Sequence, residues 1–356
     1  MKKAVVALSG GVDSAYAARL LLDQGYEAEG LCLDLFAGSK APEEAAAVAQ
    51  RLGIKLRIAD KRALFRRTVE EYFCRAYHSG LTPNPCALCN PAVKFAALLE
   101  AAEELGADNV ATGHYARRVF DCASGRYQIL RGKDPKKDQS YFLYGLGQEA
   151  LAKVVFPLGG LTKEAVRAGA ARAGLPAAAK RDSQEICFIP GNDYIAFLRG
   201  RAAEQDRATG AGKGLIEGDF VDAEGRILGR HKGLACYTVG QRKNLGASLG
   251  EKMYVLALRA EENQVVLGAD EDLYSREVAT AENRFTGGAA PDRPLALTAK
   301  LRSGAAPARA VYHPLGEGKG RLVFSVPQRA AAPGQCAVYY DGERLLGGGI
   351  IEGSRY

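Results

Sequence analysis

The chain has 356 residues, of which 47% are hydrophobic and 25% charged, and its formal net charge is +7. This composition is ordinary for a globular protein of two or three domains. No apolar run approaches the roughly 18 residues that cross a bilayer, and the apolar segment after Met1 is too short for a signal peptide. We therefore expect no membrane partner and a cytoplasmic location, in which the eight cysteines are reduced.

Strands and helices alternate through the first third of the sequence. The apolar periodicity predicts strands over residues 3–8, 27–35, 55–59 and 109–112, and helices over residues 12–24, 42–52, 64–77 and 91–105. Alternation of this kind predicts an α/β fold with a doubly wound parallel sheet, which binds ligands at the carboxyl ends of its strands. Residues 9–14 and 113–114 follow two of these strands and are therefore candidate site residues.

The segment Ser-Gly-Gly-Val-Asp-Ser at residues 9–14 joins a strand to a helix. Its two glycines let the backbone approach a phosphate, while Ser14 and the first N–H groups of the helix point at it. A Walker A loop would carry a lysine here, whereas this segment carries Asp13, which we interpret as a carboxylate facing Mg²⁺. The alternative is a plain strand–helix turn with polar caps. The segment resembles the loop of the PP-loop, or N-type ATP pyrophosphatase, family, whose members split ATP between its α and β phosphates.

Beyond Tyr115 the pattern changes. We expect a hairpin around residues 124–125, helices over residues 148–155, 163–173 and 193–201, and then short strands separated by turns, which favour a β-barrel or a sandwich. The expected organisation is a PP-loop domain with a helical and hairpin extension over residues 1–204, a central β-rich domain over residues 205–274, and a C-terminal β-barrel over residues 275–356.

Two cysteines in a proline-rich loop form the second informative motif. Cys86 and Cys89 lie just before the helix expected from Pro91, and Cys187 has Lys180 and Arg181 nearby. A helix amino terminus and basic neighbours both favour thiolates. A structural zinc site needs a second cysteine pair, which the sequence lacks, and packing is a poor explanation for a pair in a rigid loop. We favour sulfur or iron–sulfur chemistry.

Further strings extend a resemblance to the tRNA-specific 2-thiouridylases of bacteria over essentially the whole chain. They are Ala-Thr-Gly-His-Tyr at 111–115, Lys-Asp-Gln-Ser-Tyr-Phe-Leu at 137–143, Ile-Cys-Phe-Ile at 186–189, Gly-Gln-Arg-Lys at 240–243, Pro-Gly-Gln at 333–335 and Gly-Gly-Gly-Ile-Ile at 347–351. The resemblance implies ATP-dependent thiolation at C2 of the wobble uridine in the anticodon loop of tRNA. It also implies a sulfur donor, such as a cysteine desulfurase or a sulfur relay protein.

The resemblance implies a role for each motif residue. ATP and Mg²⁺ would bind at Ala7, Leu8, Ser9, Gly10, Gly11, Val12, Asp13, Ser14, Leu33 and Gly113. The tRNA and its target base would contact Asn84, Pro85, Cys86, His114, Lys137, Asp138, Gln139, Arg302 and Gln335. In catalysis, Cys89 would be the nucleophile, Cys187 would bear a persulfide, and Asp13 would act on the metal side of the phosphates.

Three places depart from the familiar family pattern. Cys86 replaces an aspartate, residues 184–185 are Gln-Glu where Thr-Gly is familiar, and residues 303–304 are Ser-Gly where an aromatic is expected. The first change makes Cys86, Cys89 and Cys187 candidate ligands of a 4Fe–4S cluster with one open iron. Persulfide chemistry that ends in a disulfide between Cys89 and Cys187 is the alternative.

Simpler explanations stay open for two motifs and for the chain as a whole. His114 is also explained as a strand-end histidine with a satisfied hydrogen bond, and residues 137–143 as a solvated loop. The chain is also compatible with a PP-loop ligase or amidotransferase that adenylates a small carboxylic acid, although such a ligase needs no paired thiols. A non-catalytic tRNA-binding protein is a further alternative.

Overall fold

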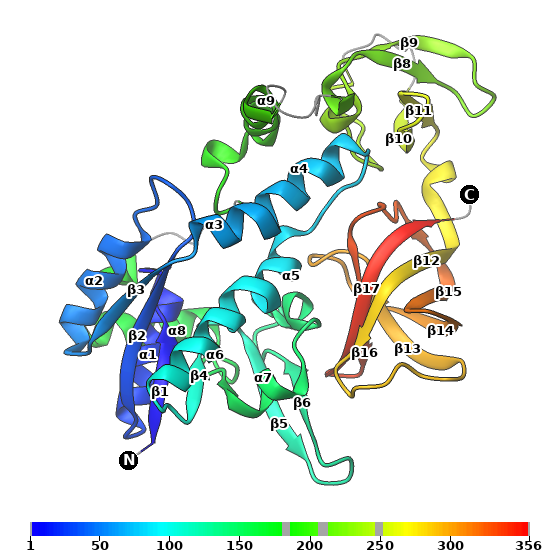
Figure 1. The fold of residues 1–356 in the computed structure, drawn as a ribbon. Helices are drawn as coiled ribbons and strands as arrows, with labels where there is room; N and C mark the ends of the chain where they lie inside the picture. Colours follow the sequence, from blue (N-terminus) through cyan, green and yellow to red (C-terminus); the bar gives the residue numbers. More distant parts are fainter. Residues whose placement is uncertain (1, 180–185, 206–212, 246–251, 355–356) are drawn as a thin grey trace.

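The fold is that of a computed structural model, which describes residues 2–179, 186–205, 213–245 and 252–354. Its strands form a five-stranded parallel sheet, a four-stranded sheet and a larger sheet in which six strands close into a barrel (Figure 1). The expected fold class, a doubly wound parallel sheet followed by two β-rich modules of which the last is a barrel, is confirmed. Lys180, Arg181 and the Gln-Glu pair at 184–185 lie outside the described residues.

The parallel sheet positions the glycine loop. Its strand order is β3-β2-β1-β4-β7. The strands are β1 (Lys3–Ala7), β2 (Glu27–Asp34), β3 (Leu56–Asp60), β4 (Asn109–Ala111) and β7 (Val154–Val155), and only β7 was not expected. The strand order reverses between β1 and β4, and a doubly wound sheet binds its ligands in the crevice at such a switch point.

Helices cover both faces of the parallel sheet. The described residues form the helices α1 (Val12–Asp23), α2 (Ala41–Leu52), α3 (Arg62–Phe65), α4 (Glu71–His78), α5 (Pro85–Cys89), α6 (Ala96–Glu104), α7 (Gln148–Lys153), α8 (Lys163–Arg172) and α9 (Tyr194–Gln205). Because side chains of a strand alternate, Ala4 and Val6 pack with α1, α2 and α8, whereas Val5 packs with α6. Among the described residues, no helix has the length and apolar character needed to cross a membrane.

Several of the expected helices have other bounds. The helix expected over residues 148–155 ends at Lys153, and Val154 and Val155 form β7. The helix expected over residues 64–77 consists of α3 and α4, joined by a π-helical turn at Arg66–Glu70. The helix expected from Pro91 instead begins at Pro85, because Asn84 Oδ1 accepts a hydrogen bond from Ala87 N (3.2 Å) and proline is tolerated in a first turn. It continues through a second π-helical turn at Asn90–Phe95 into α6. The two cysteines of the motif therefore lie inside a helix and not before it.

The β-rich parts follow the expected hairpin. The hairpin consists of β5 (Ala116–Asp121) and β6 (Arg126–Arg131), and β6 pairs with β17 of the barrel. The four-stranded sheet has the order β10-β11-β8-β9, with β8 (Gly218–Val221), β9 (Ile227–His231), β10 (Tyr254–Arg259) and β11 (Gln264–Gly268). The barrel contains β12 (Tyr274–Phe285), β13 (Leu295–Lys300), β14 (Ala308–Gly316), β15 (Lys319–Arg329), β16 (Cys336–Asp341) and β17 (Arg344–Ser354). Pairing of β12 with both β15 and β17 closes it.

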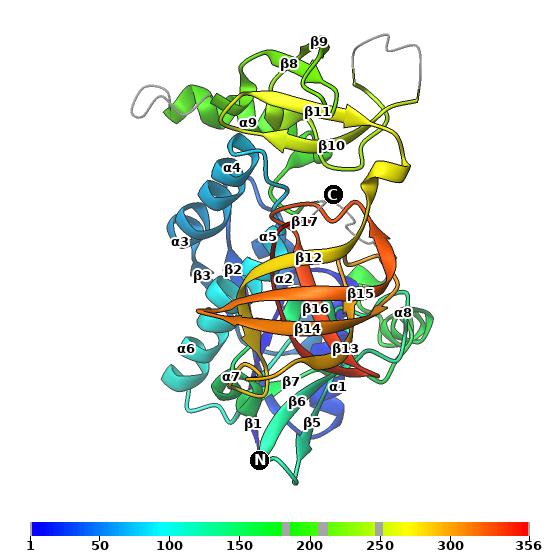
Figure 2. The ribbon, with the colours of Figure 1, turned by 90° about the vertical axis from the view of Figure 1, so that its right-hand side faces the viewer.

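The helical run from α3 to α6 lies between the parallel sheet and the barrel, and the four-stranded sheet lies beyond α4 (Figures 1 and 2). One buried cluster joins the first two of these parts. It contains Val5 and Val110 of the sheet, Leu98 of α6, and Val338 and Tyr340 of the barrel. The barrel is therefore packed directly against the domain that carries the glycine loop.

Candidate active site

The glycine loop closes on itself through its two serines. Ser14 Oγ donates a hydrogen bond to Gly11 O (3.0 Å) and accepts one from Ser9 N (3.2 Å). Gly10 has a φ of +74°, and a Cβ at this position would collide with Glu44. Glycine is therefore required here, and the first N–H groups of α1, which lack helical partners, face the crevice at the end of β1.

The other predicted ATP residues surround this loop. Leu8, just before the loop, and Val12, within it, are buried, while Ala7 and Leu33 are half-buried near the carboxyl ends of β1 and β2. Gly113, at the end of β4, touches the loop backbone, because a Cβ there would lie only 2.8 Å from Ser14 N. The structure thus brings the predicted ATP residues together at the switch point of the sheet.

Asp13 forms an ion pair that the sequence did not indicate. Lys163 Nζ, at the start of α8, lies 2.8 Å from both carboxylate oxygens of Asp13, and Tyr115 OH donates to Oδ1 at 2.8 Å. Lys163 is only 7% exposed, so its ammonium is almost fully desolvated. The glycine loop contains no lysine, and Lys163 of α8 therefore places an ammonium group beside it. No local signal in the sequence marks Lys163, which looks like an ordinary first residue of a helix.

His114 connects the nucleotide side of the site to the cysteine side. Its Nδ1 is 2.8 Å from Thr112 Oγ1, and its ring stacks on Phe95 with 5.9 Å between centroids. Burial, aided by the nearby Lys94 ammonium, holds the pKa of His114 well below its usual value of 6.5, so the imidazole is neutral at pH 7. Gly113 contacts the glycine loop, and His114 stacks on Phe95, which ends the π-helical turn after Cys89. Gly113 and His114 therefore lie between the glycine loop and the helix that carries the cysteines.

The cysteine loop is held by segments that are far away in the sequence. Gln335 Nε2 donates to Thr82 O (3.1 Å), and Thr82 N donates to Pro333 O (2.8 Å). On the other side of the loop, Asn90 Nδ2 donates to Phe142 O (3.0 Å). The barrel and the 3₁₀ turn at Ser140–Leu143 therefore fix the position of α5.

The three predicted thiols lie in one neighbourhood. Phe188 and Ile189 pack in the same buried cluster as Cys89, which places the adjoining Cys187 beside α5. Cys86 and Cys187 are exposed, whereas Cys89 is only 9% exposed. The sequence thus identified a set of thiols that the fold brings together.

Electrostatics distinguishes these thiols from ordinary surface cysteines. Desolvation by the surrounding protein raises the pKa of Cys86 and of Cys89, and it raises the pKa of Cys187 to about 12, so the expectation that these positions favour thiolates is wrong. Lys94, in the π-helical turn, acts in the opposite direction and lowers the pKa of all three thiols. Lys94 is a functional candidate that sequence reasoning missed, although its position five residues after Cys89 was a visible signal.

The thiols do not form a metal-binding group in this arrangement. Within the part of the chain that the structure describes, no three His, Cys, Asp or Glu side chains are gathered closely enough to hold one metal ion. In a 4Fe–4S cluster each cysteine binds a different iron, so its ligands need not converge on one point. A cluster held by Cys86, Cys89 and Cys187 therefore stays a prediction.

The predicted tRNA residues of the loop at 137–139 already have structural partners. The Asp138 side chain is 1% exposed and accepts a hydrogen bond from Arg131 Nε (3.1 Å) and others from two backbone amides. Gln139 Oε1 accepts a hydrogen bond from Tyr115 N (3.0 Å), and Lys137 is half-buried beside them. Asp138 and Gln139 thus order the segment after His114, and their contact with tRNA stays a prediction.

The predicted tRNA residues of the barrel are also engaged. Arg302 Nη2 donates to Ala330 O (2.9 Å), and Gln335 holds Thr82 as described above. Asn84 and Pro85 begin α5, so they lie directly beside Cys86. Among the predicted tRNA residues other than Cys86 itself, Asn84 and Pro85 are the ones that are close to Cys86 in the sequence.

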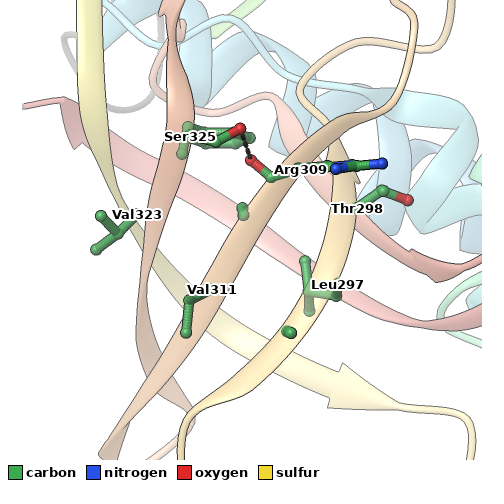
Figure 3. Close-up of a pocket in the computed structure, with 9 residues that line it drawn as sticks. Leu297, Thr298, Arg309, Val311, Val323 and Ser325 are labelled. Atoms are coloured by element: carbon green, nitrogen blue, oxygen red, sulfur yellow. Dashed lines mark hydrogen bonds between the residues drawn. The ribbon is translucent and has the colours of Figure 1, made fainter.

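A separate hollow of about 550 Å³ lies on the barrel wall formed by β13, β14 and β15 (Figure 3). Its lining is mainly apolar and includes Leu297, Val311 and Val323, and Ser325 Oγ donates to Arg309 O (3.2 Å) at one end. It contains none of the predicted site residues and is therefore separate from the candidate active site.

The fold and site together define a class. A glycine loop without a lysine, at the switch point of a doubly wound parallel sheet, is the arrangement of a PP-loop nucleotide-binding protein. Comparison with known families agrees: residues 2–191 match the tRNA methyl transferase HUP domain, residues 212–269 the tRNA methyl transferase PRC-barrel domain, and residues 275–351 the aminomethyltransferase beta-barrel domain.

Full-length relatives specify the family. The chain is 47% identical over 358 residues to the tRNA-specific 2-thiouridylase MnmA of Acidithiobacillus ferrooxidans, covering 99% of both chains. It is 45% identical to the proteins of the same name from Syntrophomonas wolfei and Moorella thermoacetica, covering 98% of this chain and 99% of each relative. The chain therefore belongs to the tRNA-specific 2-thiouridylase family. A solved 4-thiouridine synthetase–RNA complex with bound ATP aligns over 57% of this chain and 51% of its own, at 19% identity and a TM-score of 0.36.

Proposed function

We propose that the chain is an ATP-dependent tRNA sulfurtransferase that replaces O2 of the wobble uridine with sulfur taken from a cysteine persulfide. Membership in the 2-thiouridylase family supports the reaction class. The observation that carries the assignment of residues is the span of Gly113 and His114, which touches the glycine loop on one side and the cysteine-bearing helix on the other. A base lying along this span would meet an activated phosphate and a thiol at one place.

In the first step, the glycine loop binds ATP and the uridine oxygen attacks the α-phosphate. The C2 oxygen is a poor leaving group, and transfer of AMP converts it into a phosphate ester that leaves readily. Backbone N–H groups of residues 9–14 and the Lys163 ammonium stabilise the departing pyrophosphate. Asp13 would hold a Mg²⁺ that enters with ATP, and the ion would supply further positive charge there.

In the second step, Cys187 carries the incoming sulfur as a persulfide. The Cys89 thiolate attacks the Cys187 Sγ, a disulfide forms between the two residues, and hydrosulfide is released. Hydrosulfide then adds to C2 of the adenylated uridine, and AMP leaves with the original oxygen. The Lys94 ammonium supports this step because it favours the thiolate form of the cysteines.

Two macromolecular partners follow from this scheme. Cys187 is exposed, which suits transfer of sulfur from the persulfide of a donor such as a cysteine desulfurase or a relay protein. The tRNA would present its wobble base to Asn84, Pro85 and Cys86, and the base must leave its stack to reach them. A reducing cytoplasm suits this chemistry, because the disulfide must be reduced after each cycle.

The test supplies unmodified tRNA transcript, ATP and a persulfide donor, and it measures 2-thiouridine, AMP and pyrophosphate together. We expect the three products in equal amounts, and none from a transcript with cytidine at the wobble position. Pyrophosphate release driven by a small carboxylic acid without tRNA would instead identify a ligase. Binding of tRNA with no consumption of ATP would identify a non-catalytic protein.

A further inference from the structure

We infer that Cys86 is a resolving thiol, which attacks the Cys89–Cys187 disulfide left by each sulfur transfer and sets Cys187 free. The inference rests on the proposed function and adds a step that follows it. Cys86 stands where the familiar family pattern has aspartate, and an aspartate cannot attack a disulfide to form a new one. Three features of the described residues support it: the spacing of two thiols in one helix, their unequal exposure, and their shared cation.

The spacing allows a disulfide between Cys86 and Cys89. Both lie in α5, three residues apart, and such positions on a helix have Cβ atoms about 5–6 Å apart. A disulfide requires about 3.5–4.5 Å between these atoms. Closing the bond therefore needs a local adjustment of only about 1–2 Å, within a helix that already departs from regular geometry at Asn90–Phe95.

The unequal exposure gives the two thiols different tasks. Cys89 is 9% exposed and packs in a cluster with Phe73 and Phe188, so an external protein dithiol cannot reach its sulfur easily. Cys86 is exposed one turn away. Because Cys187 is exposed too, moving the disulfide from Cys89–Cys187 to Cys86–Cys89 changes which exposed sulfur the reductant meets, from Cys187 to Cys86. It also keeps the reductant from forming a mixed disulfide on Cys187, the thiol that must accept the next sulfur.

The shared cation partly offsets the desolvation that disfavours these thiolates. The Lys94 ammonium favours the thiolate forms of both Cys86 and Cys187, which are the attacking and the leaving group of the exchange. Cys86 Sγ attacks Cys89 Sγ, the Cys86–Cys89 bond forms, and the Cys89–Cys187 bond breaks. Cys187 leaves as a thiolate and takes up the proton that Cys86 lost. No electrons are gained or lost until an external dithiol reduces the Cys86–Cys89 disulfide.

The experiment identifies the disulfide that remains after one turnover. Enzyme loaded with persulfide is mixed with ATP and unmodified tRNA without reductant, quenched in acid, alkylated with iodoacetamide, digested and examined by mass spectrometry. We expect a Cys86–Cys89 disulfide and an alkylated Cys187 in the wild type, and a Cys89–Cys187 disulfide in Cys86→Ser. Cys122→Ser is the matched control, because Cys122 is exposed in the β5–β6 hairpin, and its disulfide should match that of the wild type.

Multiple turnovers give a second readout. With a thioredoxin-type dithiol as reductant, the ratio of the steady-state rate to the first-turnover rate should fall about tenfold in Cys86→Ser and stay unchanged in Cys122→Ser. A wild-type protein that forms 2-thiouridine once but retains a Cys89–Cys187 disulfide and an alkylated Cys86 would overturn the inference alone. Absence of 2-thiouridine in the first turnover would overturn the proposed function and the inference together.

Discussion

The glycine loop and the cysteine loop are built in opposite ways. Hydrogen bonds among Ser9, Gly11 and Ser14 shape the glycine loop within six consecutive residues. The cysteine loop instead depends on partners that are 52 and 253 residues away, through Asn90–Phe142 and Thr82–Gln335. ATP activation therefore rests on a motif that forms with its own strand and helix. Sulfur transfer rests on the packing of the barrel against the first domain.

The largest effect is expected for Cys89→Ser, which should stop sulfur transfer at the cysteine loop and leave ATP activation at the glycine loop intact. Cys89→Ser should lower formation of 2-thiouridine by about 1,000-fold or more, because no thiolate remains to release the sulfur. Pyrophosphate release in the presence of tRNA should stay within about fivefold of the wild type, since the glycine loop is unchanged. Both products are measured in the same reaction. Equal loss of both would show that the two halves of the site do not act separately.

Lys163→Met should produce the reverse pattern at the glycine loop. We expect pyrophosphate release to fall about 100-fold, as it does when one stabilising donor is removed from other enzymes. The free energy of unfolding should fall by about 2 kcal/mol, because Asp13 loses its buried partner while keeping some contact with water.

Two further variants sharpen the Lys163 result. The double variant Asp13→Asn, Lys163→Met should regain the stability in urea unfolding but not the activity. Lys319→Met, on the exposed surface of the barrel, is the control. Full pyrophosphate release by Lys163→Met would remove Lys163 from the proposed mechanism.

Gln335→Ala tests whether the barrel holds the cysteine loop. Loss of its hydrogen bond to Thr82 should lower the kcat for thiolation about tenfold, with pyrophosphate release kept within about twofold. Gln328→Ala is a matched control, because Gln328 Nε2 donates to Val326 O (2.8 Å) in its own strand. A rise in KM for tRNA with an unchanged kcat would instead assign Gln335 to tRNA binding, as the sequence resemblance implies.

The smallest effect concerns Lys94. Removing its charge in Lys94→Met should raise the pKa of the neighbouring thiols, so less thiolate is present at pH 7.5 and the sulfur step slows about threefold. The deficit should shrink only well above pH 9, because desolvation raises the pKa of Cys89 above its usual value of 9.0 and deprotonation limits the step until then. Lys94→Arg keeps the charge and should follow the wild-type profile. Parallel pH profiles for Lys94→Met and the wild type would contradict this role.

The same contrast explains which features the sequence could predict. Residues 9–14 and the hairpin at 124–125 are local patterns, and the structure has them where the sequence placed them. The start of α5 was predicted wrongly, because Pro91 was taken as the first residue of the helix although Asn84 and Pro85 carry the same capping signal. Lys163 was not predictable, since its partner Asp13 lies 150 residues away and only the fold brings them together.

The bond between Gln335 and Thr82 also has a consequence for synthesis of the chain. A ribosome releases residues 9–14 and Lys163 long before it reaches Gln335, and domains fold in that order. The nascent protein therefore completes its nucleotide loop early, while its cysteines gain their final support only when the last module has been translated. A prematurely terminated product would carry reactive thiols without the clamp that directs them, which makes sulfur transfer the last property that the growing chain acquires.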